Sequence, residues 1–98
     1  MIHAFVQNIS KNKIIPLYGA KRVIISTTLN LTLTAGSNTF SIGQTLAYPN
    51  TIAPIEFPVI NGKSPSYLQA PKDLTDNVYI RVIILELGGV PSDDYWDL

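Results

Sequence analysis

Apolar and polar residues alternate in several short segments, and this alternation predicts strands. In residues 28–34 three leucines alternate with threonine and asparagine, which is typical of a strand with one packed and one solvated face. The β-branched residues of 22–27 extend the pattern toward the N-terminus. Residues 35–38 are rich in turn formers and precede a short strand-like segment, so the sequence predicts a hairpin over residues 28–42.

The longest regular segment runs from Asn77 to Leu87, and both of its faces are largely apolar. We expect the face of even-numbered residues to fill a core and the other face to be covered by a second layer. That layer is either another copy of the protein or residues 1–20 of the same chain. The first face carries Val78, Ile80, Val82 and Ile84, and the second carries Tyr79, Arg81, Ile83, Leu85 and Leu87.

Arg81 would then be a charge on a covered face. A buried charge without a partner is very costly. We therefore expect Arg81 to pair with a carboxylate, either Glu56 or Glu86.

The remaining segments are short because seven prolines and six glycines interrupt the chain. Residues 4–6, 13–18 and 66–69 are strand-like. Residues 54–60 are also strand-like, and we expect them at a sheet edge or a bulge because their prolines cannot donate to a ladder. Asn61-Gly62 is a strong turn signal.

No stretch has helical periodicity. The sequence predicts an all-β protein, a small antiparallel β-sandwich with a jelly-roll-like arrangement. Residues 1–91 would form one domain and residues 92–98 an acidic, aromatic tail.

The 98 residues carry seven basic and seven acidic side chains, for a formal net charge of zero. Such a chain has no electrostatic reason to bind nucleic acid or an anionic membrane. The basic residues between Lys11 and Arg22 are typical of a solvated edge. Residues 1–8 lack the features of a signal peptide, so we expect synthesis in a cytoplasm.

Catalytic or cofactor chemistry has little support. The chain has no cysteine, and its single histidine, His3, lies at the N-terminus. The pair Asp73 and Asp76 lies in a turn-like context, and the pair Asp93 and Asp94 lies in the tail. We therefore expect no enzyme activity, no metal and no cofactor.

Aromatic residues beside proline, glycine or aspartate are the better functional signal. An aromatic ring packs on the apolar face of a sugar, and a neighbouring amide binds its hydroxyl groups. Tyr48 with Asn50, and Tyr67 with Gln69, have this composition. Packing of a loop explains the same residues without a ligand. Tyr95 and Trp96 are costly to leave in water, so we expect the tail to contact a neighbouring subunit or another partner.

The order of these segments resembles a family of small β-sandwich modules. The hairpin Thr34-Ala35-Gly36-Ser37-Asn38-Thr39-Phe40-Ser41-Ile42 leads through Tyr48-Pro49-Asn50 to the proline-bracketed strand and then to Val78-Tyr79-Ile80-Arg81-Val82. Residues 20–90 resemble modules of bacteriophage virions, namely tail-fibre or baseplate heads, head fibres and capsid decoration proteins. The resemblance implies a symmetric oligomer, commonly a trimer, on the outside of a particle.

Two functions from different classes follow. The first is a non-enzymatic virion structural or attachment module that assembles as a homo-oligomer, contacts other virion proteins and binds a host-surface glycan in the attachment case. Its candidate interface residues are Tyr79, Arg81, Ile83, Leu85, Tyr95 and Trp96. The alternative is a monomeric carbohydrate-binding module.

Overall fold

A computed structural model describes residues 3–35, 38–42 and 54–93, and these residues contain strands and no helix. No helix in this part of the chain could therefore cross a membrane. The strands are β1 (His3–Ile9), β2 (Ile14–Pro16), β3 (Ala20–Thr27), β4 (Leu31–Ala35), β5 (Asn38–Ile42), β6 (Ile55–Glu56), β7 (Lys63–Pro65), β8 (Tyr67–Gln69), β9 (Val78–Leu87) and β10 (Val90–Ser92).

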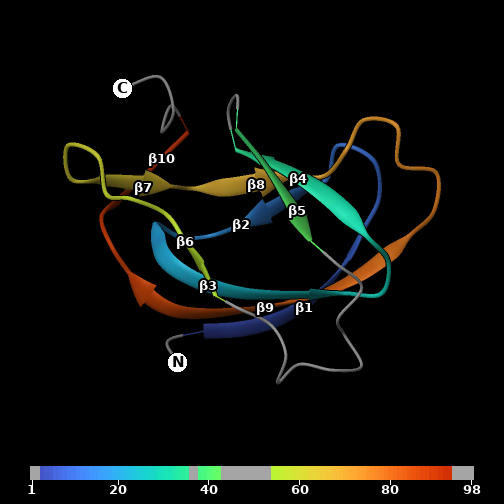
Figure 1. Ribbon diagram of the computed structural model, residues 1–98, viewed down its shortest axis with the longest axis horizontal. Coiled ribbons are helices and arrows are strands. Elements are labelled where there is room, and N and C mark those ends of the chain that lie inside the picture. Colours follow the sequence, from blue (N-terminus) through green and yellow to red (C-terminus); the bar gives the residue numbers. More distant parts are fainter. Residues whose placement is uncertain (1–2, 36–37, 43–53, 94–98) are drawn as a thin grey trace.

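Two four-stranded antiparallel sheets pack face to face (Figure 1). The strand order is β1-β9-β3-β6 in the first sheet and β2-β8-β4-β5 in the second. The pairs are nested around the β4–β5 hairpin: β3 pairs with β6, β2 with β8, and β1 with β9. This nesting across two sheets is the arrangement of a jelly roll. The predicted all-β sandwich is confirmed.

Local turn chemistry explains where the chain reverses. Asn61 and Gly62 both have positive φ, at 51° and 74°, as the two central residues of a type I′ turn require. Ile60 and Lys63 exchange backbone hydrogen bonds of 3.0 and 2.9 Å across this turn. The predicted Asn61-Gly62 turn is confirmed.

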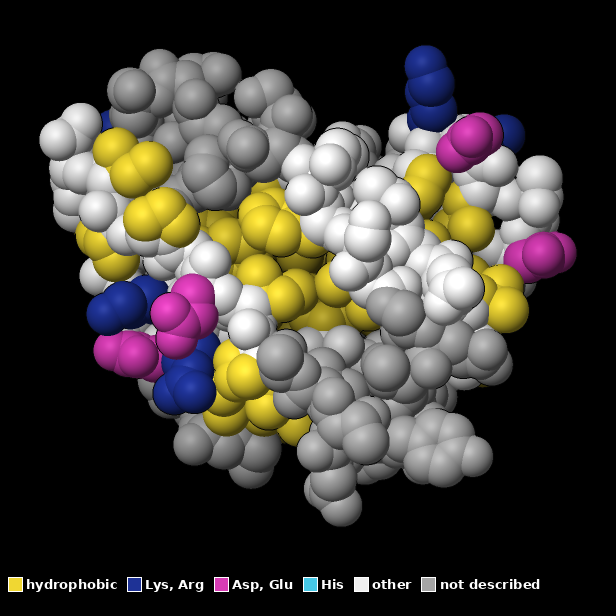
Figure 2. All heavy atoms as spheres, in the orientation of Figure 1, with side chains coloured by type: hydrophobic (Ala, Val, Ile, Leu, Met, Phe, Trp, Pro, Cys, Tyr) yellow, Lys and Arg dark blue, Asp and Glu magenta, His cyan; other side chains and the backbone are white. Residues whose placement is uncertain are grey.

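The core lies between the two sheets and is aliphatic. The first face of β9 is buried as predicted, with Val78, Ile80, Val82 and Ile84 at most 1% exposed. The second sheet contributes residues such as Leu33 and Leu68, and Figure 2 shows hydrophobic side chains lining a hollow between the sheets. The charged side chains visible in that figure lie around the rim.

The predicted continuous strand through residues 22–34 is wrong. The chain bends at Thr28 and Leu29 and crosses from the first sheet to the second. The hydroxyl of Thr27 causes this break: it accepts a 2.9 Å hydrogen bond from the Leu29 amide and donates to the Leu29 carbonyl. Leu29 is consequently 41% exposed, although Leu31 and Leu33 are buried.

The chain does not leave the fold at Pro91. Residues 90–92 form β10, which pairs in parallel with β7, and the Ser66 hydroxyl donates to the Asp93 carboxylate. The expected boundary between domain and tail at residues 91 and 92 therefore falls inside β10.

Candidate functional site

The side of the β1-β9-β3-β6 sheet that faces away from the second sheet is the main candidate surface, and we call it the outer face. Strand register places the side chains of Ala4, Ile83 and Ile24 in one row across three strands. Val6, Arg81 and Ser26 form the next row. Residues of opposite parity on these strands, such as Val23 and Ile84, point into the core.

The outer face is apolar apart from polar residues such as Arg81 and Ser26, and it is incompletely covered. Val6 is 64% exposed and Tyr79 is 53% exposed, while Ile24, Ile83 and Leu85 are half-buried. Three apolar or aromatic side chains of the expected second face, Tyr79, Ile83 and Leu85, thus lie partly open to solvent.

Residues 3–20 do not form the layer over this face. β1 lies beside β9 within the same sheet, and β2 belongs to the other sheet. Of the two coverings that the sequence left open, the intramolecular one is excluded for residues 3–20.

The expected partners of Arg81 are wrong. Glu56 lies 3.4 Å from the Nε of Arg22, because β6 pairs with β3 and not with β9. Glu86 lies 3.7 Å from the Nζ of Lys21. The Nε of Arg81 is buried with no hydrogen-bond partner among the described residues, and so is the hydroxyl of Ser26 opposite it.

Leu87 does not belong to the outer face. Two register shifts between Ala20 and Val23 leave Lys21 as an extra residue on β3 and Leu85 as an extra residue on β9, so the alternation of β9 changes phase. Leu87 therefore shares a pocket with Ile84, a residue of the inward face.

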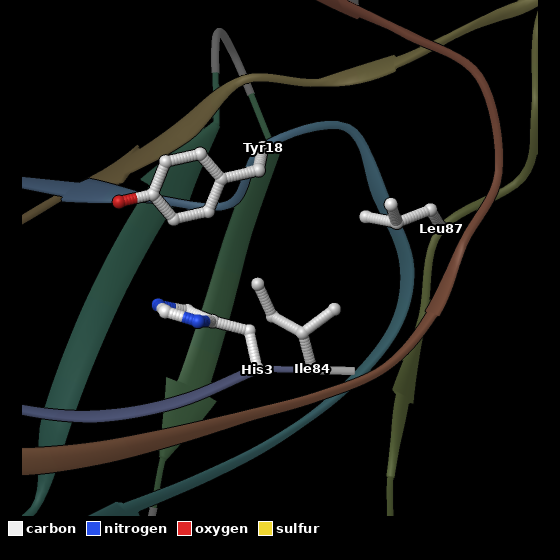
Figure 3. Close-up of a pocket in the computed structure, with 4 residues that line it drawn as sticks. All are labelled: His3, Tyr18, Ile84 and Leu87. Carbon is white, nitrogen blue, oxygen red and sulfur yellow. The ribbon is translucent and has the colours of Figure 1, made fainter. Parts of the chain in front are cut away.

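This pocket has a volume of about 370 Å³ and lies between the start of β1 and the β2–β3 turn. Figure 3 shows His3, Tyr18, Ile84 and Leu87 around a common space. The His3 and Tyr18 rings meet edge to face with centroids 5.6 Å apart. Only His3 and Tyr18 of these four residues carry polar atoms, so the pocket suits an apolar group better than acid–base chemistry.

A polar depression of about 430 Å³ lies at the outer side of the second sheet, next to the β8–β9 connection. Gln69, a predicted glycan contact, lines it, and its amide nitrogen donates a 3.3 Å hydrogen bond to the Asn12 carbonyl. Tyr67 lies on the same side of β8, since buried Leu68 separates the two residues. The polar lining consists of Asn12, Thr32, Thr34, Gln69, Lys72 and Asp73.

The other predicted contacts lie outside the described residues. These are Tyr48 and Asn50 of the glycan candidates and Tyr95 and Trp96 of the interface candidates. Within residues 3–35, 38–42 and 54–93, no three histidine or carboxylate side chains come together as metal ligands would.

Sequence reasoning missed Val6 and Ile24 as members of the outer face. The signal was present in β1, where Ala4, Val6 and Asn8 alternate with residues that face inward. This alternation identifies outer-face residues only when the register between β1 and β9 is known.

A comparison of the chain with models of known protein families, with curated proteins and with solved structures found no match to any of them.

Proposed function

We propose that this protein is a non-enzymatic structural module that assembles with copies of itself through the outer face. The observation that carries this proposal is the apolar, half-open surface formed by Tyr79, Ile83 and Leu85 on the central strand β9, beside Val6 of β1. Central strands of a monomeric sandwich normally present polar residues to solvent on their outer side.

Burial at an interface would remove this surface from water. An aliphatic side chain gains roughly 1.5–3 kcal/mol on complete burial, and the half-buried residues of the outer face have part of that gain still available. A symmetric interface repeats the gain in every copy. The formal net charge of zero leaves no long-range repulsion between copies.

The particle surface of a bacteriophage is the setting that we propose for this assembly. The resemblance to virion modules supports it, and so does the jelly roll, an architecture that recurs in viral capsid and lectin domains. A shared architecture is an analogy and does not by itself assign a function. In this setting the protein is made in the host cytoplasm and joins other virion proteins, with three copies as the number that the resemblance implies.

Replacing Ile83 with Asp tests the outer face. We expect the variant to fold, because Ile83 points away from the core, and to self-associate at least about thirtyfold more weakly, as removal of an interface hot spot of ~2 kcal/mol requires. Sedimentation equilibrium measures the association, and circular dichroism checks the fold.

Val90→Asp is the matched control, since Val90 is 66% exposed and lies on β10, away from the outer face. It should self-associate as the wild type does. A wild-type protein that stays monomeric at every concentration would contradict the proposal, as would equal association of Ile83→Asp and the wild type.

Carbohydrate binding is the second candidate function, and the polar depression beside β8 is the observation that favours it. Its hydroxyl, amide and charged side chains match the hydrogen-bonding groups of a saccharide, and its volume of about 430 Å³ admits a small one. The aromatic Tyr67 lies two residues from Gln69 on the same side of β8.

Gln69→Ala tests this candidate on a glycan array followed by titration. We expect affinity for any saccharide that binds to fall about tenfold, since a lost polar contact is worth roughly 1–1.5 kcal/mol. Thr75→Ala is the control, because Thr75 is exposed and does not line the depression. Binding that Gln69→Ala leaves unchanged would place the saccharide elsewhere.

A further inference from the structure

The free edge of strand β1 is a second possible contact surface, distinct from the outer face. β1 lies at the end of its sheet, and β9 is its only neighbour there among the residues that the structure describes. Neighbouring residues of an antiparallel strand direct their backbone groups alternately to the two sides. About half of the N–H and C=O groups of residues 3–9 therefore point away from β9. Among the residues that the structure describes, no other backbone group bonds to them.

The other outermost strands are shorter, and two of them are protected against pairing. β6 has two residues and lies between Pro54 and Pro58. β2 has three residues and ends at Pro16, and the Gln7 amide already donates a 2.9 Å hydrogen bond to the Ile14 carbonyl. Prolines, short strands and charges are the usual means by which proteins block edge pairing.

β1 has none of these means of protection. Its seven residues, His-Ala-Phe-Val-Gln-Asn-Ile, include no proline, lysine, arginine or carboxylate. It is the longest outermost strand in the described part of the chain. A long uncharged edge is a template for a further strand.

We propose that β1 pairs with β1 of a second copy, antiparallel and across a two-fold axis through Val6. This inference rests on the self-association proposed above and specifies a second contact within it. The sheets of two copies then join into one continuous sheet of eight strands, since each contributes four.

The sequence of β1 fits this pairing with itself. An axis at Val6 places His3 opposite Ile9, Ala4 opposite Asn8, and Phe5 opposite Gln7 of the other copy. Outer-face side chains of one copy then lie opposite outer-face side chains of the other copy, because side chains alternate between the two faces of a strand. Val6 meets its own copy, so the row of Val6, Arg81 and Ser26 in one outer face continues into the same row of the other copy.

This pairing also constrains the number of copies. A two-fold contact by itself gives a dimer, and combined with a three-fold contact through the outer face it gives six copies. We therefore expect an even number of chains, which differs from the trimer that the resemblance implies.

Hydrogen exchange of the wild-type protein tests the pairing directly. The amides of residues 3–9 that point away from β9 should exchange at least about tenfold more slowly in the assembled protein than in dilute monomer. Mass measurement by sedimentation equilibrium should give an even number of chains. An assembled protein with unchanged exchange in residues 3–9, or one with three chains, would overturn edge pairing and leave the proposed self-association standing.

Two variants separate the edge contact, at which Val6 lies, from the central strand of the outer face. Val6→Lys places like charges opposite each other at the axis, so the concentration-dependent protection of β1 should disappear. Tyr79→Lys changes the outer face on a central strand and should leave that protection in place. Loss of protection in Tyr79→Lys and not in Val6→Lys would contradict the proposal. A wild type that is monomeric at every concentration would overturn both proposals together.

Discussion

Replacing Gly89 with Ala should lower the free energy of unfolding by about 3 kcal/mol, the upper range for overpacking a closely packed site. The methyl group would lie against the carbonyl oxygen of Gly62, 2.8 Å from its carbonyl carbon and 3.1 Å from the Lys63 nitrogen. All three atoms are backbone, so no side-chain rotation relieves the clash. The Val90 amide donates a 2.8 Å hydrogen bond to the same Gly62 carbonyl, and separating the two segments would lengthen it.

Gly62→Ala is the control for this variant. A methyl group at Gly62 meets nothing within 4 Å, and the only strain is its φ of +74°. We expect a loss of about 1 kcal/mol, from the left-handed conformation alone. Thermal unfolding measures the difference, since 3 kcal/mol corresponds to a melting temperature lower by roughly 12–24 °C in a domain of this size. Equal losses in the two variants would show that the β9–β10 link adapts to the methyl group.

Phe57→Ala should have the largest effect of any single truncation, with a loss of about 3–5 kcal/mol. Phe57 is 1% exposed, and its ring meets that of Phe40 edge to face with centroids 5.3 Å apart. These two rings join the β6 end of the first sheet to β5 of the second. The truncation therefore leaves a cavity and removes an aromatic contact between the sheets.

Urea denaturation measures this loss, with an unchanged m-value as evidence that only stability has changed. Phe5→Ala is the matched control, because Phe5 is half-buried at the outermost strand β1. We expect it to lose about half as much. A larger loss in Phe5→Ala than in Phe57→Ala would mean that the contact between β1 and the core outweighs the Phe57–Phe40 contact.

The parts of the fold that depend on local chemistry were predictable from the sequence. The inward face of β9 was predicted because four β-branched residues at a period of two have one common side. The Asn61-Gly62 turn was predicted because both positions tolerate positive φ. The bend at Thr28 was missed because threonine favours strands, and the hydrogen bond from the Leu29 amide to the Thr27 hydroxyl is visible only in three dimensions.

The candidate surface was predictable only in part. The apolar outer residues of β9 were identified from the alternation of side chains. That alternation does not tell which segment pairs with β9 within the sheet and which segment packs over its face. That ambiguity left residues 1–20 as a possible cover, whereas β1 extends the same sheet. The partners assigned to Arg81 failed for a related reason: the strand order places Glu56 beside Arg22.

The nested pairing of the strands has a consequence for how the protein is made. A ribosome synthesises β1 first, but the partner of β1 within the sheet, β9, consists of residues 78–87. β1 therefore has both edges unpaired until the chain has grown by about 70 residues, which takes about 4–14 s at 5–20 residues per second. During that interval the uncharged strand is open to β1 of a neighbouring nascent chain on the same messenger RNA. Under the proposed pairing of β1 with β1, the density of ribosomes on the message, as well as the concentration of finished protein, would influence which copies pair.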